Sequence, residues 1–159
     1  MRRLAIIFFC TLAATPAEAQ RRPLGTWSFW GAYRENERCF AIAEPVSQRE
    51  GTRPFASVGW WPGRRLSGQV HVRLASERRP GSAVLLRIDG RTFQLAAGPT
   101  DAWAPDDRAD SEIVAAMRTG IEMTVETRSA RGGLIHDTYR LRGAATAIDA
   151  AAIACRRSR

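Results

Sequence analysis

The sequence predicts a mainly β fold, an antiparallel β-sandwich of jelly-roll type with two short helices. Short apolar segments recur about every 8–15 residues and are separated by Gly, Pro, Asn and Asp. Several of them alternate between apolar and polar residues, as strands with one buried face do. The 159 residues are 45% hydrophobic and 25% charged, a composition typical of a globular protein. We therefore expect a single β-sandwich domain over residues 20–159.

The expected strands follow from these segments and from the turns between them. We predict strands at residues 26–33, 38–43, 55–61, 69–75, 83–88, 92–95, 121–127 and 135–141. The strict alternation in 69–75 turns Gln69, His71 and Arg73 away from the core. Asp89 and Gly90 predict a tight type I′ turn.

Two segments have helical rather than strand spacing. Residues 110–120 carry Ile113 and Met117 four positions apart and end at Gly120. Residues 144–154 are rich in alanine, and we expect Ile148 and Ile153 to dock on the sheet.

The first 19 residues have the features of a signal peptide. Arg2 and Arg3 precede the apolar run 4–14, and Ala17 and Ala19 offer the small side chains that signal peptidase recognises. The run is too short for a membrane span, so we expect cleavage before Gln20 and a periplasmic or secreted protein without a transmembrane segment. Removing two arginines and one glutamate lowers the net charge from +8 to +7.

Cleavage leaves two cysteines, Cys39 and Cys155. An oxidising compartment allows them one intramolecular pairing, so we predict a disulfide between the second predicted strand and the last helix. A redox or nucleophilic thiol is disfavoured, because the sequence has neither a Cys-x-x-Cys motif nor a histidine near either cysteine.

The usual catalytic and cofactor motifs are missing. There is no G-x-S-x-G elbow, no P-loop and no G-x-G-x-x-G run. His136 and Asp137 are neighbours on a strand, so their side chains point to opposite faces; we interpret His71 and His136 as surface residues. Two histidines and two paired cysteines cannot supply the three or four ligands of a zinc site without carboxylates. We expect no enzyme activity, no metal and no cofactor.

One acidic cluster leaves an alternative open. It consists of Asp101, Asp106, Asp107, Asp110 and Glu112. Carboxylates just ahead of a helix are favoured by its dipole, and the spacing does not fit an EF-hand, so capping is the preferred interpretation. A pair of these acids in glycosidase geometry remains an alternative, since distances in space decide it.

The tryptophans supply the candidate binding surface. Trp60 and Trp61 are adjacent on a predicted strand and point to opposite faces, as we also expect of Trp27 and Trp30. We predict that one member of each pair fills the core. The exposed tryptophan of the first pair, bordered by Arg64 and Arg65, would form a patch for a ligand or partner.

The positive charge consists of arginine alone, since the sequence has no lysine. An exported protein does not meet the chromosome, so nucleic acid is not the expected partner. An anionic polymer, or a protein of the envelope or host surface, is the expected partner.

The chain resembles the invasion-associated locus B family of exported proteins of Gram-negative bacteria. The resemblance rests on the Trp-bearing segment 26–33, on RCFAIAEP around Cys39, on 110–127 and 137–143, and on ATAIDAAAIAC ending at Cys155. It implies a disulfide-containing β-sandwich of the periplasm or cell surface, linked by name to host-cell invasion. Only the paired cysteines carry over residue by residue.

These observations predict a non-enzymatic binding or accessory protein of the envelope. Two alternatives stay open: an envelope hydrolase that uses carboxylates in 101–112, and a periplasmic inhibitor or carrier protein.

Overall fold

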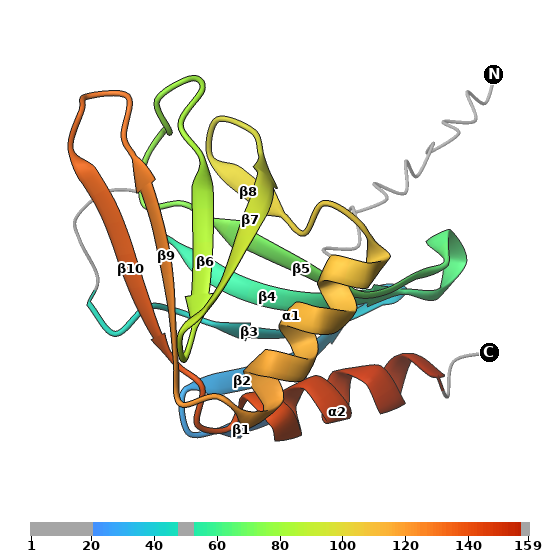
Figure 1. The fold of residues 1–159 in the computed structure, drawn as a ribbon. Coiled ribbons are helices and arrows are strands. Elements are labelled where there is room, and N and C mark those ends of the chain that lie inside the picture. The colour runs from blue at the N-terminus through green and yellow to red at the C-terminus, as the bar shows by residue number, and fades with distance from the viewer. Residues whose placement is uncertain (1–20, 48–52, 157–159) are drawn as a thin grey trace, which may run out of the picture.

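The computed structural model describes residues 21–47 and 53–156, so the predicted signal peptide, residues 1–19, lies outside the described residues. Within them the chain forms one antiparallel sheet and two α-helices (Figure 1). The strands are β1 (Arg22–Trp27), β2 (Trp30–Glu35), β3 (Arg38–Ala43), β4 (Phe55–Trp61), β5 (Leu66–Arg73), β6 (Val84–Ile88), β7 (Arg91–Ala97), β8 (Asp101–Trp103), β9 (Glu122–Arg128) and β10 (Leu134–Arg140). The helices are α1 (Asp107–Thr119) and α2 (Ala144–Arg156), with a 3-10 turn, η1, at Pro62–Arg64.

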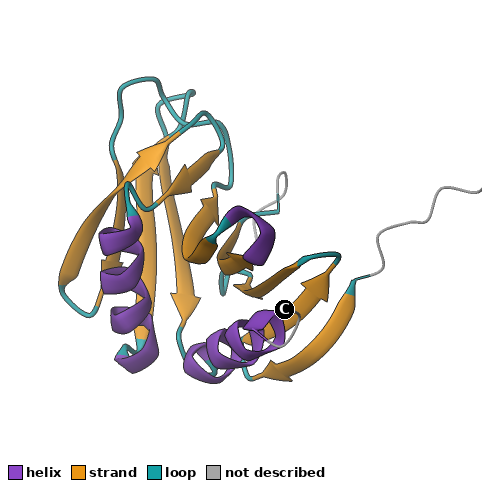
Figure 2. Ribbon diagram, turned by 90° about the vertical axis from the view of Figure 1, so that its right-hand side faces the viewer, coloured by secondary structure: helices purple, strands orange, loops and turns teal. Residues whose placement is uncertain are grey.

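The sheet consists of two halves joined through β7. Its strand order is β1-β2-β3-β4-β5-β8-β7-β6-β9-β10. The first part of β7 pairs with β6, whereas Ala96 and Ala97 pair with β8. In Figures 1 and 2 the half formed by β6, β9 and β10 stands steeply against the half formed by β1–β5. The sandwich-like arrangement therefore comes from one continuous, bent sheet.

Contacts at the far ends of the sheet draw the two halves together. The indole Nε1 of Trp30 on β2 donates to the carbonyl of Arg140 on β10 at 2.9 Å. Beyond β3, the amide of Val46 donates to the carbonyl of Thr138 at 2.8 Å. These bonds satisfy polar groups along the edge of β10 that a free edge strand would leave unpaired.

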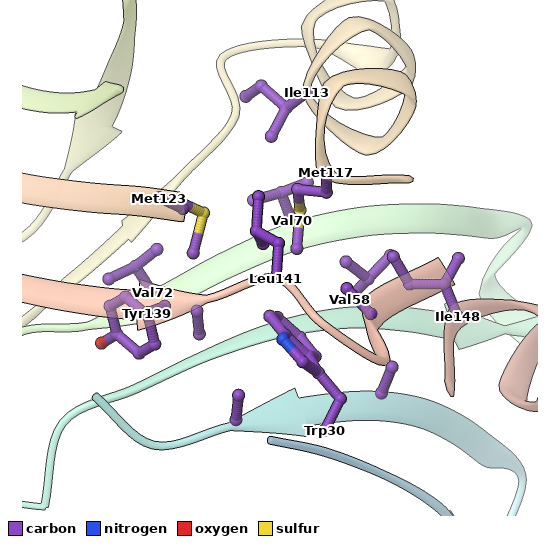
Figure 3. Close-up of a cluster of buried hydrophobic side chains, with 14 of the residues drawn as sticks. Trp30, Val58, Val70, Val72, Ile113, Met117, Met123, Tyr139, Leu141 and Ile148 are labelled. Atoms are coloured by element: carbon purple, nitrogen blue, oxygen red, sulfur yellow. The ribbon is translucent and has the colours of Figure 1, made fainter. Parts of the chain in front are cut away.

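The core lies between the halves and the two helices. Figure 3 shows Met123 of β9 and Tyr139 of β10 on the same side of the cluster as Val72, with Trp30 below and Ile113 above. Helix α1 packs on β5, and α2 packs on β1 to β4. Both helices thus lie on the inner side of the sheet.

The predicted fold class is confirmed: the protein is mainly β and antiparallel, with two helices. Strands β3 and β4 match the predicted ranges 38–43 and 55–61. The type I′ turn is also confirmed, since Asp89 and Gly90 both have positive φ, 42° and 87°.

The predicted single strand 26–33 is wrong. The chain turns at Ser28, where φ is 54°, and β1 and β2 form a hairpin in which Trp27 pairs with Trp30. Cross-strand partners share a face, so both indoles pack towards the core instead of pointing apart. The alternation rule failed because it assumes that no turn intervenes.

Three further details differ from expectation. Strand β8 falls within the acidic stretch and was not predicted, and α1 starts at Asp107 rather than at residue 110. Ile153 does not dock on the sheet, since 44% of it is exposed. Five residues separate it from the buried Ile148, which corresponds to about 140° around the helix.

Candidate functional site

Trp60 and Trp61 end β4 beside the η1 turn and point to opposite sides of the sheet. Trp60 packs against the core on the α2 side. Trp61 lies over Gly59 on the other side: a Cβ on that glycine would come within 2.5 Å of the indole. The expected division of this pair between the two faces is thus found, with both indoles half-buried.

Trp60 forms part of a pocket of about 330 Å³ between the η1 turn and the end of α2, here called the disulfide pocket. It is lined by Trp60, Pro62, Arg65, Leu66, Ser67, Ala152, Cys155 and Arg156. Its volume lies at the lower end of the range of small-molecule sites. The lining combines apolar surface with two arginines and includes no acidic residue.

Neither arginine of this pocket is neutralised by an ion pair among the described residues. By contrast, Arg118, Arg87 and Arg140 each lie within 4 Å of a carboxylate oxygen. Arg65 has a left-handed backbone, with φ of 56°, at the end of the η1 turn, and Arg156 is the last residue of α2. The pocket therefore offers two cations without an ion pair among the described residues beside an apolar wall. Arg156 acts on Asp149 from a greater distance and helps to lower the pKa of that carboxyl.

Trp61 and Arg64 border a different pocket, of about 320 Å³, against the β2–β3 turn. Its other lining residues are Glu35, Asn36, Glu37, Arg38 and Gly63, so it carries both signs of charge. The predicted patch of Trp60, Trp61, Arg64 and Arg65 is thus divided between two sides of the sheet. The division follows from the alternation of side chains along a strand. Whether these residues bind a ligand stays a prediction.

The predicted disulfide is present. Cys39 on β3 and Cys155 on α2 are bonded, with their Cα atoms 5.7 Å apart and a sequence separation of 116. The bridge fastens the last turn of α2 to the sheet directly behind the disulfide pocket. It thereby holds Arg156 opposite the η1 turn.

The residues of the acidic cluster form separate structural contacts. Asp106 caps α1, with its Oδ1 accepting from the Ala109 amide at 2.8 Å. Asp110 is buried and accepts from the Val70 amide at 2.6 Å; burial raises its pKa. Asp101 lies on β8, where burial tends to raise its pKa, but hydrogen bonds from Thr100, His71 and Arg73 together lower it.

Both histidines have carboxylate partners that the sequence pattern did not suggest. His71 Nε2 lies 2.8 Å from Asp101 Oδ1, and His136 Nδ1 lies 2.9 Å from Glu126 Oε1. Each pair joins two strands: β5 with β8, and β10 with β9. The alternation in 69–75 predicted that His71 points outward. Its partner, Asp101, lies on β8, a strand that was not predicted.

No protein-family model and no curated protein sequence matches the chain. Among solved structures, invasion associated protein B from Bartonella henselae is similar, with a TM-score of 0.62 at 17% sequence identity. The alignment covers 84% of this chain and 98% of that protein. The chain has the invasion associated protein B fold. The resemblance seen in the sequence is thereby confirmed at the level of the fold.

Two further observations concern the described residues of this chain. Within 21–47 and 53–156, no group of three or more His, Cys, Asp or Glu side chains is arranged to hold a metal ion. Over the same ranges, neither helix has the length and apolar character needed to cross a membrane.

Proposed function

We propose that this chain is an exported, non-enzymatic binding protein of the invasion-associated locus B family, acting in the periplasm or at the cell surface. The signal-peptide pattern of residues 1–19 supports export. The shared fold with the Bartonella henselae protein supports the family assignment. Because that protein is named for invasion, an envelope or host-surface molecule is the class of partner that we propose.

The disulfide pocket is the ligand site in this proposal. The observation that carries it is that Arg65 and Arg156 line the pocket with Trp60, while none of its lining residues is acidic. Guanidinium groups bind carboxylate, phosphate and sulfonate oxygens through charge-assisted hydrogen bonds. The apolar wall favours an apolar group next to that charge. The proposed ligand therefore carries an anionic group on an apolar body.

The test uses the mature chain and 1-anilinonaphthalene-8-sulfonate, an aromatic sulfonate of this chemistry. Binding is followed by fluorescence titration with the wild type and with the double variant Arg65→Gln/Arg156→Gln. One charge-assisted hydrogen bond contributes about 1.5–3 kcal/mol. We therefore expect the variant to bind at least about tenfold more weakly.

A matched control removes two exposed arginines remote from the pocket, in Arg79→Gln/Arg131→Gln. This variant has the same net charge as the first one. If both variants bound the sulfonate equally weakly, its binding would depend on the overall charge of the protein and not on the pocket, which would overturn the proposal. Undiminished binding by Arg65→Gln/Arg156→Gln would do the same. Thermal unfolding of each variant verifies that the fold is retained.

A further inference from the structure

The outer face of the β1–β5 half, continued on β8, carries aromatic side chains on the side away from both helices. Tyr33, Phe40, Phe55, Trp61 and Trp103 lie on this face and do not belong to the core cluster. Tyr33 and Phe40 stack with their ring centres 5.8 Å apart. Phe40 is almost covered, with 5% of it exposed, whereas the other four rings are half-buried and accessible in part from this side.

The outer face of the other half has a different character. Across β6, β9 and β10 it presents ion pairs: Arg87 with Glu126 at 3.6 Å and Arg140 with Glu122 at 3.3 Å. His136 adds to this group through Glu126. Such alternating charges are usual for a sheet face that is in contact with water. The aromatic face is thus a local property of one half of the sheet.

A single cross-strand row runs through the aromatic face. Its members are register partners on five neighbouring strands: Gly31, Ile42, Ser57, His71 and Trp103. Four strand spacings make this row roughly 19 Å long. Its first three side chains are small or aliphatic, and Ser57 at its centre is 9% exposed.

The row begins in a hollow of about 410 Å³ between Phe29, Tyr33, Ile42 and Pro45. Gly31 forms part of this hollow, and a Cβ at that position would lie 2.8 Å from the ring of Tyr33. The ring of Tyr33 can lie flat here because residue 31 has no side chain. Phe29, at the rim, is 52% exposed.

The row ends at a set of three rings. His71 and Trp103 stack with centres 5.2 Å apart and planes within 7°, and Phe55 meets His71 edge-on at 5.2 Å. Asp101 accepts from Arg73 and contacts His71, while the Arg73 guanidinium lies over the Phe55 ring. These polar groups are held in place by their mutual contacts and surround the rings.

The charged groups of this face form ion pairs with one another. Glu35 lies between Arg21 and Arg38, and Asp101 between Arg73 and His71. The disulfide pocket, in contrast, has two cations and no acid. A ligand with an anionic group is therefore complementary to that pocket, whereas the aromatic face matches a ligand without net charge.

We propose that this aromatic face binds a neutral oligosaccharide laid across the strands from the hollow at Gly31 to Trp103. The C–H faces of sugar rings pack on aromatic rings, and their hydroxyls both donate and accept hydrogen bonds. The carboxylate of Asp101 and the guanidinium of Arg73 supply the complementary acceptor and donors. This site is separate from the disulfide pocket and does not depend on it.

The test is isothermal titration of the mature chain with two neutral probes, cellohexaose and the hexamer of N-acetylglucosamine. We expect saturable binding of at least one of them. Phe29→Ser and Trp103→Leu, at the two ends of the row, should each weaken it about tenfold, as loss of an aromatic anchor does. Phe29 is exposed, so its variant keeps the test valid if Trp103→Leu fails to fold.

Two controls separate this proposal from the one above. Leu134→Ser removes an apolar side chain of similar exposure, 53% against 52% for Phe29, from the other outer face and should leave binding unchanged. Arg65→Gln/Arg156→Gln should also bind the oligosaccharide normally. The proposal is overturned if neither hexasaccharide binds or if Phe29→Ser binds like wild type. It is also overturned if sedimentation shows a dimer that Phe29→Ser dissociates, because a second copy would then cover the face.

Discussion

Asp110 connects helix α1 to strand β5 through its buried carboxylate. Its Oδ1 accepts from the Val70 amide at 2.6 Å, beyond the part of β5, His71 to Arg73, that pairs with β8. The carboxylate thus takes the place of a strand partner. Burial raises the pKa of Asp110, the Val70 amide lowers it in part, and Asp107 and Asp106 raise it further.

The raised pKa leads to a pH-dependent prediction. The folded protein binds the Asp110 proton more tightly than the unfolded chain does, so this contribution to stability is complete at low pH and is lost as the pH rises through the folded-state pKa. Asp110→Asn retains an oxygen acceptor without a charge. We expect urea unfolding to show the variant gaining stability relative to wild type as the pH increases above about 4.

Glu112→Gln is the control, because Glu112 is a carboxylate on the same helix that is more exposed and is not among the groups that shift the pKa of Asp110. Parallel pH profiles for wild type and Asp110→Asn would contradict the prediction. Asp110→Ala should be less stable by about 1–3 kcal/mol at every pH, because it leaves a buried amide unpaired.

Helix α1 begins three residues earlier than its apolar spacing predicts. Asp106 has an extended backbone and caps the helix through the Ala109 amide. The preference for capping over catalysis agrees with this role, but the sequence contains several acids suited to it. Which of these acids caps the helix depends on where β8 ends. Strand β8 is too short for a recognisable sequence pattern.

Removal of this cap has a defined effect. Asp106→Ala should lower the free energy of unfolding by about 1 kcal/mol, whereas Asp106→Ser should retain most of it. Thermal or urea unfolding measures both, with Asp107→Ala as a control that changes the charge in the first turn without removing the cap. Equal stability of Asp106→Ala and wild type would show that the helix start does not depend on this side chain.

The disulfide holds α2 to the half of the sheet that this helix covers. Cys39 and Cys155 are both buried, and the loop that they close spans 116 residues. Since α2 also packs on β1 to β4, the bridge joins the last element of the chain to the first strands. Its stabilisation should therefore be seen in global unfolding.

The double variant Cys39→Ala/Cys155→Ala tests this. The chain-entropy model assigns such a loop about 4–5 kcal/mol as an upper value. A loss near 4 kcal/mol would lower the melting temperature by roughly 8–16 °C, as measured by calorimetry. Reduction of the wild type should produce a shift of the same size. If the melting temperature did not change, the prediction would be contradicted, and α2 would be held to the sheet by packing alone.

Local patterns were sufficient for the fold class, for β3 and β4, for the turn at Asp89 and for the pairing of the two cysteines. The first three depend on residues that are neighbours in the sequence, and two cysteines allow only one intramolecular pairing. All of them can therefore be derived from the sequence. The bent continuous sheet, the turn at Ser28 and the partners of His71 depend on contacts between distant segments. The candidate sites belong to this second group: Arg65 meets Arg156, and Gly31 lines up with Trp103, because the sheet brings together strands and a helix that lie far apart in the chain.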